Sequence, residues 1–283
     1  MLSPRVKGFY FPDWILSGLV WLTAIAVSTI FLWIVFAVGV RGWGQLSLSF
    51  LVSEPTNAGR DGGIAPILVS TLAILVVCLG AALPFGLGTA LLLAELTASD
   101  RRLGNWVRRS LDLLAGVPSI VFGLFGNAFF SQVLGLGFSI LSGGLTLACM
   151  VLPLLIRATE AALRSQPGSY RQGAAALGLS QTTTLFKILL PAALPGLMVG
   201  LVLGIGRALA ETAALIFTSG YVDRFPESWL DSGRALSIHI FDLSMNVAGG
   251  DANAAASAIV LLLLLLLFNG LAALVTLRWS TFH

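Results

Sequence analysis

The sequence predicts an all-α integral membrane protein with about six transmembrane helices and both termini on the cytoplasmic side. Charged residues make up only 10% of its 283 residues, whereas a soluble domain carries about 25%. The mean hydropathy of +0.94 is correspondingly high. Several uncharged runs are long enough to cross a bilayer, among them Trp14–Val40, of 27 residues, and Leu113–Ile156, of 44 residues. A helix needs about 20 apolar residues to cross a bilayer, so the longer run holds two spans.

The uncharged runs extend over the whole chain, so residues 1–283 are expected to form a single membrane domain. The first run is too long for the apolar part of a cleavable signal peptide, which has about 7–15 residues, and is interpreted as a retained span. Glycines between 131 and 144 mark the turn that separates the third and fourth spans. The predicted spans are approximately 14–40, 66–94, 111–131, 143–163, 194–219 and 254–277.

Basic residues set the orientation, because lysine and arginine concentrate in cytoplasmic loops. With a cytoplasmic N-terminus, ten basic residues fall on the cytoplasmic side: Arg5, Lys7, Arg101, Arg102, Arg108, Arg109, Arg164, Arg171, Lys187 and Arg278. Four fall on the opposite side: Arg41, Arg60, Arg224 and Arg234. The outer loop 220–251 is net acidic and is expected to face a partner outside the cell. Its apolar stretch Ala235–Leu243 is expected to pack on the membrane surface or on that partner.

Several functions are excluded by the residues that the chain lacks. Its basic residues form no continuous face of the kind that binds nucleic acid. Neither histidine has cysteine or histidine neighbours at metal-ligand spacing, so no metal site is expected. There is no Gly-Lys-Ser/Thr phosphate loop and no serine–histidine–acid set, so neither ATP hydrolysis nor another enzymatic activity is expected of this chain.

The segment between the fourth and fifth spans predicts a short cytoplasmic helix at about 168–179. Its alanines favour a helix. Gly178 suits the left-handed conformation that ends one, and Pro191 is expected to break the chain before the fifth span. Such a helix could dock in a groove of a partner protein or lie on lipid headgroups.

This segment resembles the cytoplasmic signature of ABC importer permeases, which reads Glu-Ala-Ala, three residues, Gly, nine residues, Ile, one residue, Leu-Pro. The matching positions are Ala174, Gly178, Ile188, Leu190 and Pro191, while Gln172 stands where the family has glutamate. The resemblance implies the type I importer permease fold. It also implies that a coupling helix containing Arg171 seats in a separate, dimeric ATPase that binds ATP and magnesium.

Further motifs are similar to those of phosphate permeases of the PstA kind. They are Gly116-Val-Pro-Ser-Ile-Val-Phe-Gly123, Leu152-Pro-Leu-Leu-Ile-Arg-Ala-Thr-Glu-Ala-Ala-Leu163 and Gly206-Arg-Ala-Leu-Ala-Glu-Thr-Ala-Ala-Leu215. This resemblance implies a phosphate importer in the bacterial inner membrane, with a PstC-like second permease and an external phosphate-binding protein.

Two motifs place charges or a proline inside spans and are candidates for the anion path. Arg207 and Glu211 are four residues apart and are expected to share one face of the fifth helix. A charge at that depth is costly and should face a cavity or a partner. The two residues are therefore expected to line the substrate path or to form a structural ion pair within the membrane. Pro118 and Ser119 interrupt the third span and could form a hinge, line the path or be a packing kink.

Arg157, in the cytoplasmic half of the fourth span, is a second candidate, because guanidinium groups bind oxyanions in a bidentate way. A ladder of charges at the headgroup level is the alternative interpretation. At the level of the whole protein, the alternatives are a permease for another oxyanion, the PstC-like partner, a secondary transporter and a membrane-embedded enzyme. The signature spacing argues against the secondary transporter.

Overall fold

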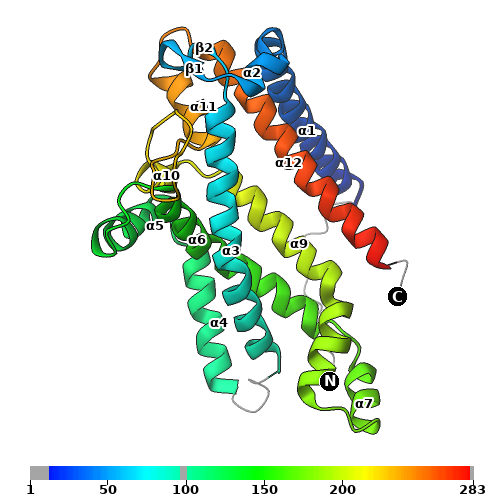
Figure 1. Cartoon of the computed structure of the whole chain (residues 1–283). Coiled ribbons are helices and arrows are strands. Elements are labelled where there is room, and N and C mark those ends of the chain that lie inside the picture. The colour runs from blue at the N-terminus through cyan, green and yellow to red at the C-terminus, as the bar shows by residue number, and fades with distance from the viewer. Residues whose placement is uncertain (1–12, 96–100, 281–283) are drawn as a thin grey trace, which may run out of the picture.

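The computed structural model describes residues 13–95 and 101–280, and most of these residues lie in helices (Figure 1). Arg5 and Lys7, which contribute to the predicted cytoplasmic charge, lie outside the described residues. Five helices are long and apolar enough to cross a membrane, and a bent pair could form a sixth span. The five are Trp14–Gln45, Ala65–Ala94, Ile140–Arg164, Gln181–Leu209 and Asp251–Arg278. The architecture is therefore the all-α membrane fold that the uncharged runs predict.

One end of the molecule carries the short elements that follow the first span (Figure 1). These are the 3-10 helix η1 (Trp43–Gln45), α2 (Leu48–Val52), β1 (Pro55–Thr56), the 3-10 helix η2 (Asn57–Gly59) and β2 (Asp61–Gly62). The two strands pair antiparallel, with Thr56 opposite Asp61. The helix α11 (Leu236–Met245) lies close to them. We call this the outer end, because the positive-inside rule assigns its loops to the outside.

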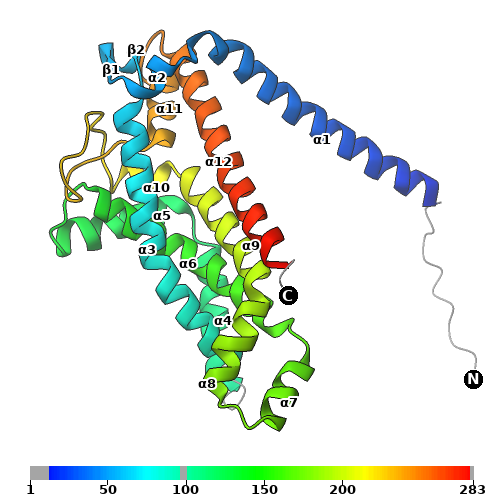
Figure 2. The same ribbon diagram turned by 45° about the vertical axis from the view of Figure 1, so that its right-hand side comes forward.

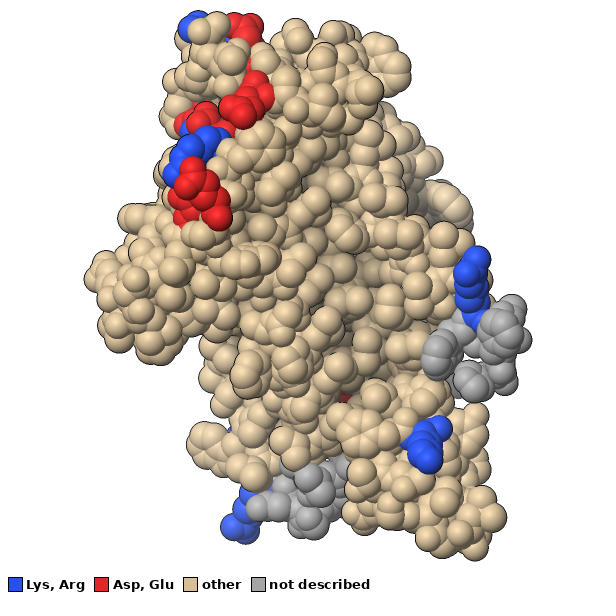
Figure 3. Space-filling view, in the orientation of Figure 1, with Lys and Arg blue, Asp and Glu red and all other residues tan. Residues whose placement is uncertain are grey.

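The opposite, cytoplasmic end carries the C-terminal part of α3 (Ala65–Glu95), the start of α4 (Arg101–Ala115) and α7 (Gly168–Ala176) (Figure 1). Figure 3 shows acidic side chains gathered near the outer end and basic side chains at the cytoplasmic end. The surface between these ends is almost free of charge on the face shown, as expected of a surface in contact with lipid tails.

The core is a stack of three helices, with α6 (Ile140–Arg164) between α3 and α9 (Leu190–Leu209). Glycines on α9 let it approach α6 closely. In lipid the hydrophobic effect does not drive helices together, so close van der Waals packing between small residues becomes the main attraction. A Cβ at Gly196, Gly200 or Gly204 would lie 2.5 Å from Ala162 Cβ, 2.6 Å from Ala158 Cβ or 2.8 Å from Val151 Cγ1, respectively. This four-residue spacing fixes how α9 lies on α6.

Two helices lie outside this core. α1 (Asp13–Gly42) leans away from the rest of the molecule and meets α12 (Asp251–Ser280) near the outer end (Figure 2). At the point of contact, a Cβ on Gly42 would lie 2.6 Å from the backbone nitrogen of Ala256. The apolar sides of α1 are otherwise exposed along its length, which suits a helix surrounded by lipid or by another subunit.

The third span, predicted over about 111–131 with an interruption at Pro118 and Ser119, is bent at that interruption. The helix α4 ends at Ala115, and α5 (Ser119–Gly126) starts after Pro118 and continues as the π-helix η4 (Asn127–Val133). The direction of the helix axis changes by 100° between the two halves. Pro118 has no amide hydrogen to continue the helical ladder, and its ring clashes with the preceding turn.

The fifth span differs from its prediction at both ends. It starts at Gln181, because α8 (Gln181–Thr184), the π-helix η5 (Leu185–Leu189) and α9 form one continuous helix. It ends at Leu209 and is followed, after a short break, by α10 (Ala213–Ile216). The predicted 194–219 therefore runs too far on the outer side.

The stretch Ala235–Leu243 also differs from expectation: Leu236, Ile238 and Leu243 are fully buried within the chain, so they do not pack on the membrane surface.

Candidate functional site

The predicted coupling segment forms the helix α7, which stands at the cytoplasmic end (Figures 1 and 2). Gly178 has a φ of +68°, in the left-handed region. The amide of Gly178 donates to the Ala175 carbonyl and that of Leu179 donates to the Ala174 carbonyl, both at 3.0 Å. This is a Schellman motif, in which glycine ends the helix and satisfies its last carbonyls. Ala174 is buried, whereas Leu177 is 78% exposed, so the tip of α7 presents an apolar side chain outward.

Pro191 does not break the chain, contrary to the sequence-based expectation. The preceding turn widens into the π-helix η5, in which the Leu190 amide donates to the Leu185 carbonyl, five residues earlier. A π-turn changes the hydrogen-bond register, so the helix can admit a proline that lacks a donor. Ile188 and Leu190 consequently lie half-buried in the first turns of the fifth span. Gln172 is exposed on α7, and Arg171 turns back to donate to the Leu163 carbonyl at 3.4 Å.

A buried carboxylate organises the cytoplasmic ends of α4 and α6. Glu160 has a side chain only 4% exposed, and three arginines surround it. Its Oε1 lies 2.6 Å from Arg108 Nε and 3.0 Å from Arg164 Nε, and its Oε2 lies 3.6 Å from Arg157 Nη1. We call these four residues the Glu160 cluster. Sequence reasoning found the ladder Arg157, Glu160 and Arg164, but it missed Arg108, which is 52 residues from Glu160.

Arg157 belongs to this cluster and also pairs with Asp112 of α4. Its Nη2 donates to both carboxylate oxygens of Asp112, at 2.7 and 3.0 Å. The two side chains are 41% and 57% exposed, respectively. Arg157 is therefore held by acids on two helices, on a more accessible side of the cluster than Arg108.

Arg207 and Glu211 do not form the ion pair that their spacing predicts. The helix ends at Leu209, between them, so they share no helical face. Glu211 instead accepts a hydrogen bond from the Ala214 amide, 3.2 Å from its Oε1, at the start of α10. A carboxylate there satisfies an amide that has no partner within the helix, which favours the change of direction. Within the described residues the Arg207 side chain has no hydrogen bond or ion pair, and it is exposed.

The bend at Pro118 opens a groove between α4, α5 and α6. Its volume is about 490 Å³. It is lined by apolar side chains, including those of Leu111, Val117, Phe122, Phe125, Leu152 and Ile156. Pro118 is exposed and Ser119 half-buried beside this groove's Val117, but neither residue lines it. Such a lining suits a lipid chain or an apolar side chain rather than an anion.

Comparison with known proteins decides the family. The family described as "Binding-protein-dependent transport system inner membrane component" matches residues 82–281. This chain belongs to that family. It is 30% identical over 255 residues to a probable ABC transporter permease protein, YqgI, of Bacillus subtilis, covering 86% of each chain. It is 32% identical over 235 residues to the phosphate transport system permease protein PstA 2 of Mycobacterium bovis, covering 81% of this chain and 76% of the relative.

Solved structures support the same fold for this permease. A chain of a bacterial ABC transporter involved in the import of the acidic polysaccharide alginate superposes with a TM-score of 0.67. The match covers 92% of this permease and 96% of that chain, at 18% sequence identity. At this identity the likeness concerns the fold alone. The protein is a multi-pass permease component of an ABC importer, a family that works with an ATPase and a substrate-binding protein.

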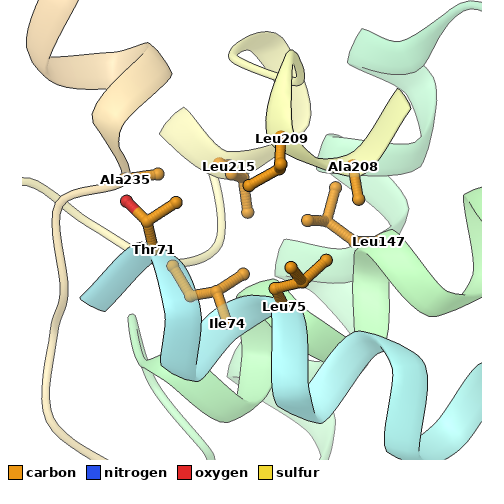
Figure 4. Close-up of a pocket in the computed structure, with 8 residues that line it drawn as sticks. All are labelled: Thr71, Ile74, Leu75, Leu147, Ala208, Leu209, Leu215 and Ala235. Atoms are coloured by element: carbon orange, nitrogen blue, oxygen red, sulfur yellow. The ribbon is translucent and has the colours of Figure 1, made fainter. Parts of the chain in front are cut away.

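A small cavity lies where the fifth span of the permease ends (Figure 4). Apolar side chains from α3, α6, α9 and α10 point into it, among them Ile74, Leu147, Leu209 and Leu215. Its volume of about 10 Å³ is at the lower limit for one water molecule, which would also need several polar partners. The cavity is therefore a packing gap beside the break at 210–212 and not a substrate site.

At the outer end of the permease, a buried guanidinium organises the long loop. Arg234 donates from Nε to the Tyr221 carbonyl at 2.8 Å, and its Nη1 lies 3.4 Å from Asp242 and 3.9 Å from Asp223. The same Nη1 lies 3.4 Å from Nδ1 of His239, which is 1% exposed. Burial, with a smaller contribution from Arg234, lowers the pKa of His239 to about 4. We call Arg234, Asp223, Asp242 and His239 the Arg234 cluster.

The described residues contain no group of three histidine, cysteine or acidic side chains able to hold a metal ion.

Neither the Glu160 cluster nor the Arg234 cluster was expected from the sequence as a unit. Spacing reveals partners only along one helix, whereas Arg108 and Glu160 come from different helices. The signal that could have pointed to them is the presence of single charges at span ends, which must find opposite charges in order to be buried.

Proposed function

We propose that this permease imports inorganic phosphate as the PstA-like half of a two-permease pore. A PstC-like permease supplies the other half, two ATPase subunits bind and hydrolyse ATP with magnesium, and an external phosphate-binding protein delivers the anion. The observation that carries the proposal is the likeness to the mycobacterial phosphate permease over most of both chains. The motifs that contain Arg157 and Arg207 support it, because phosphate needs cationic partners inside the membrane.

Arg207 is the first candidate for contact with the anion. It lies at the end of α9, exposed and without a partner in the described part of the chain, where helix α9 gives way to the break at 210–212. A guanidinium that no acid neutralises is available to an anion, and its planar donors match two phosphate oxygens. The role first expected for Glu211, as the counter-ion of Arg207, is replaced by its capping of α10.

Arg157 is the second candidate, nearer the cytoplasm. Its contacts with Asp112 are partly open to solvent, so an anion that reaches this level could compete with that carboxylate. The bend at Pro118 and Ser119 would position this part of the path, because it sets the direction of the helix that carries Asp112. The coupling helix α7, with the exposed Gln172 and Leu177, would seat in the ATPase.

The test is uptake of radiolabelled phosphate by vesicles that contain the complete transporter, with sulfate and molybdate as competitors. We expect Arg207→Gln to reduce uptake about 10- to 100-fold, the value of one or two charge-assisted hydrogen bonds, without loss of assembly. Arg207→Lys should be intermediate, because an ammonium lacks the bidentate fork. Arg109→Gln, on the exposed face of α4, is the matched control.

Normal uptake by Arg207→Gln would exclude Arg207 from the path. Stronger competition by sulfate or molybdate than by unlabelled phosphate would assign the permease to another oxyanion.

A further inference from the structure

The Glu160 cluster joins three helices at the level where the coupling helix meets the membrane domain. We propose that Glu160 is a positioning residue that makes the cytoplasmic ends of α3, α4 and α6 move as one body. A displacement of α7 is thereby transmitted to the helices that carry Arg157. This inference rests on the proposed role of α7 in contacting the ATPase.

The carboxylate of Glu160 contacts arginines from two helices. One oxygen of Glu160 contacts the Nε atoms of both Arg108 and Arg164, and the other faces Arg157. Arg108 comes from α4, whereas Arg157 and Arg164 lie one turn before and one turn after Glu160 on α6. Because the acid is almost fully buried, its contacts are little screened by water.

The Glu160 cluster is also connected to α3. The Leu93 carbonyl lies in the last turn of α3, where carbonyls have no partner within the helix. It accepts from Arg108 Nη2 at 3.0 Å and from Arg164 Nη2 at 3.1 Å. Two of the three arginines that contact Glu160, Arg108 and Arg164, therefore also cap α3. Loss of the carboxylate would release Arg108 of α4 from α6 and would leave the Leu93 carbonyl as the shared partner of the two arginines.

The path from the Glu160 cluster to α7 is short. Glu160 is four residues before Arg164, where α6 ends, and α7 starts at Gly168. Arg171 on α7 donates back to the Leu163 carbonyl. Leu163 itself is fully buried against Leu189 and Ala193 of the fifth span. A movement of α7 is thus delivered to α6 within about one helical turn of Glu160.

The apolar contacts that join α4 to α3 and α6 at this level are few. A small group of buried side chains, Ala90, Leu93, Leu111 and Ile156, joins α3, α4 and α6 there. Apolar contacts are not directional, and α4 is attached to α5 only through the bend at 116–118. The directional contact of Glu160 with Arg108 fixes the rotation and register of α4 on α6, which apolar contacts leave free. Arg157 and Arg164, on the same helix as Glu160, hold its carboxylate in place for that contact.

The experiment uses the complete transporter in vesicles and measures, for each variant, assembly, ATP hydrolysis stimulated by the binding protein, and phosphate imported per ATP hydrolysed. For Glu160→Gln we expect normal assembly and retained hydrolysis. The number of phosphate ions imported per ATP should fall about tenfold, within the range of typical coupling free energies. A residue with a purely structural role would lower the amount of complex and leave this ratio unchanged.

Two further variants keep the test decisive. Should Glu160→Gln fail to accumulate, Arg108→Gln removes the contacts of α4 with Glu160 and with the Leu93 carbonyl. It leaves Glu160 with Arg157 and Arg164, and it should lower the same ratio. Glu160→Asp retains the charge and should restore part of it. Wild-type import per ATP in Glu160→Gln, or in Arg108→Gln where the first variant does not accumulate, overturns the proposal.

The proposed functions on which this inference rests are tested separately. Gly178→Val changes only the end of α7, where a Cβ would meet no atom within 4 Å but would require a strained positive φ. If that variant assembles and couples normally, the role of α7 is wrong, whatever Glu160 does. If the wild-type complex imports another anion, the ratio is measured with that anion and the inference about Glu160 still stands.

Discussion

The two ends of the permease bury ions of opposite sign. At the cytoplasmic end a carboxylate, Glu160, contacts three arginines. At the outer end a guanidinium, Arg234, contacts two aspartates, a carbonyl and His239. Basic residues are in excess at the cytoplasmic end, the feature from which the positive-inside rule assigns the orientation, whereas the outer loop is net acidic. At each end, one buried ion is surrounded by side chains of the opposite charge.

The two clusters differ in what they join. The contacts of Arg234 all come from the segment 221–242, so this cluster shapes a single loop and the start of α11. The contacts of Glu160 come from two long helices, and its arginines reach a third. Loss of the outer ion should therefore unfold a loop locally, whereas loss of the inner ion should disconnect helices that remain folded.

The largest expected effect on stability follows replacement of Arg234. Arg234→Gln leaves Asp223, Asp242 and the Tyr221 carbonyl without their cation, and breaking such a buried contact typically costs about 3–5 kcal/mol. The measurement is protease sensitivity of the outer loop, together with the thermal midpoint of the purified complex in detergent.

Arg224→Gln is the matched control. Arg224 pairs with Asp231 in the same loop at 2.9 Å but is 52% exposed, and exposed pairs contribute at most about 1 kcal/mol. Equal effects of the two replacements would show that burial does not distinguish the outer ions, and the comparison of the two ends would lose its basis.

Several residues show which parts of the structure could be predicted from the sequence and which could not. Uncharged runs and basic residues predicted the membrane architecture, because they depend only on the cost of charge in lipid. Gly178 could be placed at a helix end, because glycine has a local conformational preference. The partnership of Arg108 with Glu160 depends on how α4 packs on α6, which no local pattern encodes. The four-residue spacing of Arg207 and Glu211 predicted that the helix of the fifth span continues past Glu211. In the structure that helix ends earlier and Glu211 caps α10.

A second effect, of intermediate size, depends on pH and should occur only at the outer end. The unfolded chain protonates His239 near its ordinary pKa of about 6.5, whereas the folded protein does so near a pKa of about 4. Above pH 6.5 the residue is neutral in both states and contributes nothing to the pH dependence. Between pH 6.5 and 4 only the unfolded chain gains the proton. The free energy of unfolding therefore decreases as the pH is lowered, by about 3 kcal/mol in total.

The charges that face His239 are Arg234, which opposes protonation, and Asp242, which favours it. His239→Gln should remove the loss of stability between pH 6.5 and 5. The thermal midpoint of the complex as a function of pH provides the measurement. An unchanged pH profile in the variant would place the titrating group elsewhere.

The smallest effect is expected for Asp112→Asn, and it separates the two sides of the Glu160 cluster. Asp112 is 57% exposed and its partner Arg157 keeps a second contact, to Glu160, at 3.6 Å. Loss of this pair should therefore cost no more than about 1 kcal/mol, as for other exposed ion pairs, and should leave the helices joined. Thermal stability and phosphate imported per ATP should both stay near wild type, in contrast to Glu160→Gln. A loss of coupling as large as that of Glu160→Gln would move the positioning role from the buried carboxylate to the exposed one, because Asp112 would then be the residue that holds α4 on α6.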